Sequence, residues 1–245
     1  MSSRCGTQKD GSRALASFVR SNYIHRMNTT RAAGEQPILL AAIEAFGRRG
    51  LEGASTRDIA KAANKPMSAI TYHFGGKEGL YKACAEQIAR SMGGQLASAL
   101  AAAEEICADK QDGAAARNAL SVIFERYAAA MVSNEIAVFA RFIVREQMDP
   151  TEAFDILWGG VMGRLLDRIA SLLVTISGQR LSIAEARVRT MALMGQVIVF
   201  RVAHATVLRL NRWKQVGPAQ RRAIHQVIQV HLSAILDQLA SGATR

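Results

Sequence analysis

Apolar residues recur three and four positions apart along most of the chain, and little of it alternates apolar and polar residues as a β-strand does. A first helix is predicted to begin at Pro37, which suits a first turn, and to stop at Gly50, which follows Arg48 and Arg49. The apolar residues of this segment lie at helical spacing: Ile38, Leu39, Ala42, Ile43 and Phe46. We therefore expect a helix with one apolar face.

Two short helices joined by a tight turn are predicted next. Ser55 precedes Asp58 by three residues, a variant of the capping box, and starts a short helix that runs to Ala63. Asn64 then allows a sharp turn because asparagine tolerates a left-handed backbone, and Pro66 starts the third helix. Short helices joined in this way form a helix-turn-helix.

Longer helices are predicted beyond Lys77. Their expected ranges are 77–107, 113–132, 135–147, 151–177, 182–211 and 218–240. Turn signals at Asp149-Pro150, Ser177-Gly178 and Gly217-Pro218 separate the last four ranges. With only four prolines and few aromatic residues, the chain is predicted to be all-α, with a three-helix N-terminal part and a larger helical C-terminal part.

The third predicted helix, which covers residues 66–74, has an apolar and a polar face. At about 100° per residue, the side chains that face the first two helices are Met67, Ile70 and Phe74. Those on the opposite side and its flanks are Ser68, Ala69, Thr71 and Tyr72, with His73 near the boundary. The segment is therefore predicted to be a core corner whose packing turns small side chains outward.

This small outward face suits the major groove of DNA. Serine and threonine hydroxyls can hydrogen-bond base edges, and Ala69 and the Thr71 methyl group can contact thymine methyls. Because the face carries no Arg, Asn or Gln for bidentate base reading, we expect affinity to rest mainly on phosphates. The candidate phosphate-binding residues are Thr56, Arg57, Tyr72, His73 and Lys77.

The formal charge of +11 and the isoelectric point near 10.2 indicate a polyanionic partner. Charge alone does not choose among DNA, RNA and an anionic membrane. The longest run without Asp, Glu, Lys, Arg or His, 91–103, is shorter than the ~20 apolar residues that cross a bilayer, and the N-terminus has no apolar core of a secretory signal. We therefore expect a cytoplasmic protein without a membrane partner.

Residues 1–30 are basic, rich in turn-forming residues and weakly patterned. One interpretation is a disordered basic arm that strengthens nonspecific phosphate binding. The other is sequence upstream of a functional start at Met27.

No catalytic or metal-binding pattern is present in the sequence. Cys5, Cys84 and Cys107 lie far apart without a C-x-x-C pair, which is typical of reduced thiols and not of a disulfide framework or a zinc site. There is no Walker loop, G-x-G-x-x-G or G-x-S-x-G, and His225 and His231 lie six apart and do not share a helix face. We expect neither enzymatic activity nor a cofactor.

Residues 31–81 contain AAIEAFGRRG, ASTRDIAKAAN, AITYHF and GGKEGLY, and these segments resemble the DNA-binding domain of the TetR family of bacterial transcriptional regulators. The later segments FIVREQMDPTEAFDIL and ALMGQVIVFRVAHATVLRLNRW resemble the CecR-like branch of that family. The resemblance implies a helix-turn-helix domain over 31–80, after the extension 1–30, and a helical effector-binding and dimerisation domain over 81–245.

Carried over residue by residue, the resemblance assigns base-facing positions to Met67, Ser68, Ala69 and Thr71. It assigns largely phosphate-facing positions to Thr56, Arg57, Tyr72, His73 and Lys77. Three residues depart from the family pattern: Asn64 replaces a usual glycine, Lys65 a usual apolar residue and Thr71 a frequent tyrosine. Because Lys65 stands where the family usually has an apolar residue, Met67 is the apolar residue that would replace it in the core. Met67 therefore has two competing assignments, to core packing and to base contact.

The resemblance further implies a homodimer on a palindromic operator, released by a small-molecule effector, with repression as the family's commoner mode. One short recognition helix reads too few base pairs, whereas a two-fold pair reads half-sites ~34 Å apart. The last two long helices, or the 151–177 helix with the final one, are expected to form the dimer contact. The alternative is a nonspecific nucleic-acid-binding or architectural protein.

Charged residues within apolar helices of the second domain suggest a ligand pocket, because burying an unpaired charge is costly. The candidate pocket residues are Phe139, Phe142, Arg145, Glu146, Trp158, Met162, Met194, Phe200, Arg201 and His204. The competing interpretation is a structural Glu–Arg pair inside an ordinary apolar core.

Overall fold

The computed structural model describes residues 34–108 and 112–242, so the predicted arm over residues 1–30 lies outside the described part, as does Cys5. Within the two described ranges every regular element is a helix, which confirms the all-α prediction. None of these helices is by itself long and apolar enough to cross a membrane, although two bent helix pairs reach the threshold when their halves are combined.

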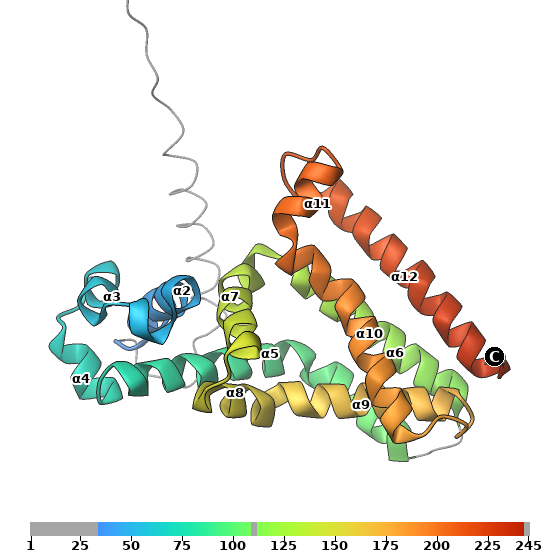
Figure 1. The fold of residues 1–245 in the computed structure, drawn as a ribbon. Helices are drawn as coiled ribbons and strands as arrows, with labels where there is room; N and C mark the ends of the chain where they lie inside the picture. The colour runs from blue at the N-terminus through green and yellow to red at the C-terminus, as the bar shows by residue number, and fades with distance from the viewer. Residues whose placement is uncertain (1–33, 109–111, 243–245) are drawn as a thin grey trace, which may run out of the picture.

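Three helices gather at one end of the molecule: α2 (Gln36–Gly53), α3 (Thr56–Ala62) and α4 (Ser68–Phe74) (Figure 1). The long helix α5 (Lys77–Ala108) leads from them into the larger helical part. The later elements are α6 (Gly113–Met131), α7 (Asn134–Met148), α8 (Glu152–Leu157), the π-helical turn η1 (Trp158–Met162), α9 (Gly163–Ile176), α10 (Ile183–Val202), α11 (His204–Leu210) and α12 (Pro218–Ser241).

Short polar residues cap the starts of many helices. The Ser55 hydroxyl accepts a hydrogen bond from the backbone N–H of Asp58 at 3.3 Å, which confirms the predicted start of α3. Asp112, Ser133, Thr151 and Ser182 cap α6, α7, α8 and α10 in the same way. These caps satisfy backbone N–H groups that have no partner within their own helix.

The predicted helix boundaries differ from the structure in three places. α2 continues to Gly53, and the expected stop at Gly50 is an internal break with φ 73° and ψ 179°. The predicted helix 151–177 is interrupted by η1, and the predicted helix 182–211 is broken at Ala203, where α10 and α11 meet at 77°. Neither of the last two breaks contains a proline. The Gly159-Gly160 pair within η1 was a glycine signal that the sequence prediction did not use, whereas neither glycine nor proline marks the break at Ala203.

A row of aromatic rings connects the N-terminal helices to the rest of the molecule. The ring of Tyr81 on α5 meets Phe46 of α2 edge-on, with ring centroids 4.9 Å apart, and lies 4.6 Å from the ring of Phe142 on α7. All three side chains are buried within one continuous apolar cluster. Edge-on aromatic pairs add about 0.5–1.5 kcal/mol beyond the burial of their area, so α2, α5 and α7 are held as one packed unit.

α8, η1 and α9 follow one another along α5, and each of the three contacts it. One series of buried apolar residues along this path is spaced by four: Ala153, Leu157, Val161, Leu165 and Ile169. A β-carbon built at Gly160 would lie 2.7 Å from the β-carbon of Ala89 on α5. The helices therefore cross closely at the π-helical turn, where a larger side chain would not fit.

Candidate functional site

The turn between α3 and α4 is fixed by its backbone. Asn64 adopts φ 54°, which confirms the predicted left-handed residue. Its N–H donates to the carbonyl of Lys61 at 3.1 Å, and the N–H of Lys65 donates to the carbonyl of Ala60 at 3.0 Å. These two bonds form a Schellman motif, so the end of α3 sets the direction in which α4 leaves.

α4 buries one side and presents the other to solvent. Ile70 is 2% exposed, and Phe74 packs against the core from the same side. Ser68 and Thr71 are exposed, and Tyr72 is 85% exposed. A two-turn helix with small polar side chains is therefore available to enter a DNA groove.

Two residues of this segment lie differently from the helical-wheel prediction. Met67 is 58% exposed, so its placement on the buried stripe was wrong; it lies one turn before Ile70, at the free end of α4. Ala69 is only partly exposed and packs against the core, so it lies at the edge of the outward face.

The five candidate phosphate-binding residues lie at helix ends around this face. Thr56 and Arg57 begin α3, and Arg57 is exposed. Tyr72 and His73 end α4 with their rings 5.0 Å apart, and His73 Nδ1 lies 3.4 Å from Glu35 Oε1. Lys77 begins α5, where its Nζ donates to the backbone carbonyl of Glu52 at 3.0 Å.

Glycines shape the join between α4 and α5. Gly75 ends α4 with φ 74° and Gly76 follows with φ 128°, both in the region that favours glycine. A β-carbon built at Gly79 would lie 1.8 Å from the carbonyl oxygen of Phe74. Sequence reasoning missed this requirement, although a glycine inside a predicted helix was the signal for a close approach.

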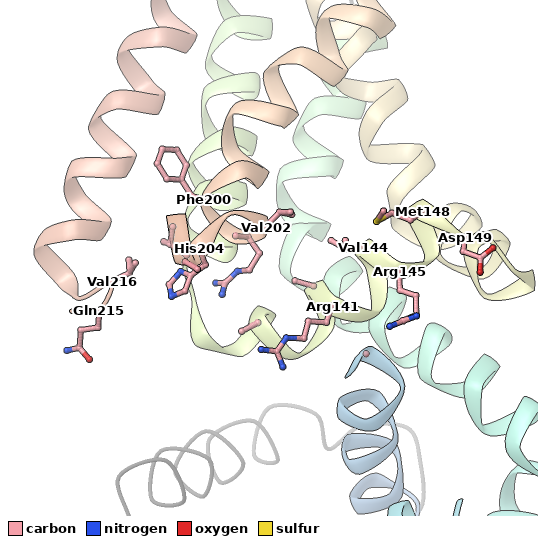
Figure 2. Close-up of a pocket in the computed structure, with 16 residues that line it drawn as sticks. Arg141, Val144, Arg145, Met148, Asp149, Phe200, Val202, His204, Gln215 and Val216 are labelled. Carbon is pink, nitrogen blue, oxygen red and sulfur yellow. The ribbon is translucent and has the colours of Figure 1, made fainter. Parts of the chain in front are cut away.

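A cavity of about 810 Å³ lies between α7, the break that joins α10 to α11, and Gly47 of α2 (Figure 2). Four of the ten candidate pocket residues line it: Arg145, Phe200, Arg201 and His204. Arg141, four residues before Arg145 on α7, also lines it. The i, i+4 spacing of the two arginines was the sequence signal for a shared face.

The other six candidates lie outside this cavity. Phe139 and Phe142 are buried in the apolar core, and Met194 packs against it. Trp158 is exposed and stacks on Phe154, while Met162 Sδ accepts a hydrogen bond from Gln147. The sixth, Glu146, is a buried carboxylate with partners of its own.

Glu146 is 1% exposed and joins α5, α7 and the start of α8. Its Oε1 accepts from the hydroxyl of Tyr81 at 2.5 Å, and its Oε2 accepts from the N–H and the hydroxyl of Thr151, both at 3.0 Å. Burial and the hydrogen bond to Glu146 raise the pKa of Tyr81 above its usual value. The carboxylate is thus satisfied by uncharged donors and not by an arginine.

Arg201 ties α10 to the end of α6. Its Nε donates to the carbonyl of Met131 at 2.6 Å, and its Nη2 donates to the carbonyl of Ser133. Burial lowers the pKa of Arg201 because desolvation disfavours the charged form. Within the described ranges, the Arg201 guanidinium at the cavity wall is therefore hydrogen-bonded to backbone carbonyls and not to a carboxylate.

An exposed recognition helix, a capped turn before it and a long helix leading into a larger helical part define a helix-turn-helix regulator. Residues 38–84 match the model of bacterial regulatory proteins of the tetR family, and residues 116–239 match the C-terminal domain of the HTH-type transcriptional dual regulator CecR. The chain belongs to the TetR family of bacterial transcriptional regulators and is CecR-like within it. Its family members and relatives are regulators and not enzymes.

The relative CecR of Shigella flexneri is 31% identical to this chain over 211 residues, which cover 84% of this chain and 94% of that protein. Two solved structures share the fold. FadR from Bacillus subtilis, determined in complex with stearoyl-CoA, has a TM-score of 0.52 at 15% identity over 85% of this chain and 99% of its own. A transcriptional regulator from Rhodococcus sp. Rha1 has a TM-score of 0.51 at 18% identity, over 84% of this chain and 97% of its own.

Proposed function

We propose that the protein is a ligand-responsive repressor that binds a palindromic operator as a homodimer and leaves it when a small-molecule effector binds. The observation that carries this proposal is the exposed face of α4, held outward by buried Ile70 and by the turn at Asn64. Such a face can enter the major groove. The basic net charge supplies the sequence-independent part of DNA affinity.

Base reading and phosphate binding are divided between two sets of residues in this proposal. Base edges are read by Met67, Ser68 and Thr71, with Ala69 at the edge of the contact. Phosphates are bound by Thr56, Arg57, Tyr72, His73 and Lys77. Hydroxyl and methyl groups discriminate bases modestly, so most of the affinity comes from the second set.

The dimer contact is proposed to use α10 and α12, which touch each other. Exposed apolar or small residues recur along α10 at steps of four and three: Ala184, Val188, Met191, Gly195 and Val199. The same spacing occurs on α12: Ala223, Val227, Val230 and Ala234. Val188 and Val230 are 71% and 61% exposed in the single chain. Two helices with such stripes bury them when a second copy packs against them.

Effector release follows from differential affinity. A ligand lowers DNA affinity only if it prefers the conformation in which the two recognition helices are wrongly spaced for the half-sites. α5 begins beside α4 and packs along α8 and α9, so it is the element proposed to carry that change. The proposal therefore requires an effector site that touches a helix coupled to α5.

The test is a comparison of DNA affinities at fixed salt concentration. The full chain is titrated with the DNA upstream of its own gene and with a shuffled sequence of the same length and composition. A specific regulator binds its site at least ~10³-fold more tightly than random DNA. Equal affinity for both sequences would contradict this proposal and support the nonspecific or architectural alternative.

A further inference from the structure

The cavity beside α7 carries more positive than negative charge. Arg141 and Arg145 project from α7 into it, and His204 lies across the gap at the start of α11 (Figure 2). Arg201 also lines the cavity, whereas Asp149 is the single acidic residue among the lining side chains. A concave site lined by one sign of charge concentrates its field and attracts small ions of the opposite sign.

The two arginines of α7 are not neutralised within the protein. In residues 34–108 and 112–242 neither Arg141 nor Arg145 forms an ion pair. They lie four residues apart on one helix face, where like charges repel and destabilise a helix by a few tenths of a kcal/mol. Both are exposed at the cavity, so an entering anion reaches them and relieves this repulsion.

Apart from the charged residues, His204 and Gln215, the lining residues carry no polar side chain. The lining side chains that carry no polar group include Val144, Met148, Phe200, Val202 and Val216. Guanidinium groups orient a carboxylate or a phosphate through paired charge-assisted hydrogen bonds, and an apolar wall holds a hydrocarbon body. We propose that this cavity binds a small amphipathic anion, a carboxylate or phosphate ester with an apolar body, and that Arg141 and Arg145 bind its head group.

The same two arginines lie against α2, the first helix of the N-terminal group. A β-carbon built at Gly50, the break in α2, would lie 2.9 Å from Arg145 Nη1, and one built at Gly47 would lie 3.2 Å from Arg141 Cβ. α2 therefore rests directly on the side chains that would turn toward a ligand. If Arg145 moves to meet an anion, its contact with Gly50 changes, and α2 shifts against α7.

This regulatory consequence rests on the proposed function and gives the effector a site at the joint between α2 and α7. The ligand's preference between two packings of this joint would supply the differential affinity that release of DNA requires. The anion-binding site itself is independent of DNA and can be tested without it.

The probes are four molecules that share an eight-carbon chain: octyl phosphate, octanoate, octanol and octylammonium. Calorimetric titration of the full chain measures binding of each. We expect the two anions to bind at least about tenfold more tightly than the neutral and cationic compounds, as expected for charge-assisted hydrogen bonds. Octanol binding as tightly as octanoate and octyl phosphate would contradict the proposal.

Variants assign the binding to the arginines. R141Q/R145Q removes both charges and is expected to weaken anion binding by about tenfold or more, whereas R141K/R145K keeps the charges and is expected to restore part of it. R164Q/R168Q is the matched control, because it removes two arginines of the same spacing on α9 that do not line the cavity. Wild-type anion affinity in R141Q/R145Q would overturn the assignment, as would an equal loss in the control.

The effect on DNA is measured as the change that octyl phosphate causes in the operator affinity of each variant. A fall of about tenfold in the wild-type protein, abolished in R141Q/R145Q, would support the coupling through Gly50. Arginine-dependent anion binding without any change in DNA affinity would overturn the coupling. If the protein binds its operator specifically but does not bind the anions, the anion site is contradicted and the proposed function stands. If it binds the anions but shows no sequence preference for DNA, the anion site stands and the proposed function is contradicted.

Discussion

The surface around α4 and the cavity beside α7 are built in opposite ways. The candidate DNA-contacting residues of the first lie between Thr56 and Lys77, and hydrogen bonds between near neighbours in sequence fix the turn that joins α3 to α4. The second draws its lining from positions as far apart as Gly47 and Val216. A site of the first kind depends on local backbone geometry, and one of the second kind depends on how whole helices pack.

The largest expected effect tests the local construction of the surface around α4. Gly79→Ala places a methyl group where the carbonyl of Phe74 lies, and α5 must then move away from α4. We expect a loss of more than about 3 kcal/mol in the free energy of unfolding, together with loss of DNA binding. Denaturant unfolding and a DNA-binding titration measure the two effects.

Gly94→Ala is the matched control on the same helix, because a β-carbon there would meet no atom within 4 Å. It is expected to be neutral or stabilising by up to about 1 kcal/mol, since alanine is the better helix former. Equal stability of the two variants would show that the close approach at Gly79 has no energetic weight.

The second prediction concerns the need for two copies of the α4 surface. Val188→Glu with Val230→Glu places a charge on both proposed dimer helices, and we expect association to weaken by about 100-fold or more, which is about 3 kcal/mol. Analytical ultracentrifugation measures the association. Val122→Glu on α6, an exposed valine outside this face, should leave it unchanged. Dimers of wild-type strength in the double variant would place the contact elsewhere.

The third prediction tests the packing on which the cavity depends. Glu146→Gln replaces the acceptor of three hydrogen bonds by a group whose NH₂ cannot accept from Thr151. We expect the free energy of unfolding to fall by about 2 kcal/mol, because a buried donor is left without a partner. Denaturant unfolding measures it, and Glu152→Gln, on an exposed pair with Lys82, is expected to change stability by less than about 1 kcal/mol.

The fourth prediction separates phosphate contact from base contact. Lys77→Ala should weaken binding to all DNA sequences alike and lower the salt slope by about one, because one phosphate contact is lost. Removing the donor to the Glu52 carbonyl should also cost about 1 kcal/mol of stability. Binding isotherms at several salt concentrations measure the first effect. A change in sequence preference would contradict the assignment.

The smallest expected effect lies at the bases. Ser68→Ala and Thr71→Val each remove one hydroxyl and should alter preference at single operator positions by about 1 kcal/mol. Selection from randomised DNA measures this preference. If both variants kept the wild-type preference but lost affinity uniformly, the two residues would contact phosphates.

The local surface was predictable from sequence because its determinants are short-range. The cap at Ser55, the left-handed Asn64 and the buried Ile70 were all predicted and are all present. Met67 was misplaced because a helical wheel gives the direction of a side chain and not how far the neighbouring helices extend. The cavity was predicted only in part, since the bend at Ala203 brings His204 opposite α7 and no proline or glycine marks that bend.

The π-helical turn η1 has a consequence for how this chain keeps contact with α5. A repeat of four residues drifts by about 40° per step around an α-helix, so five such positions cannot all face one neighbour along a straight α-helix. Because a π turn absorbs roughly one additional residue, η1 cancels much of that drift. The stripe from Ala153 to Ile169 can thus follow α5 without a loop. Because the π turn absorbs that residue, deleting one residue from Trp158–Met162 would restore a regular α-helix and leave the buried face of α9 toward α5, whereas deleting one residue from within α9 itself would rotate the rest of that helix out of phase.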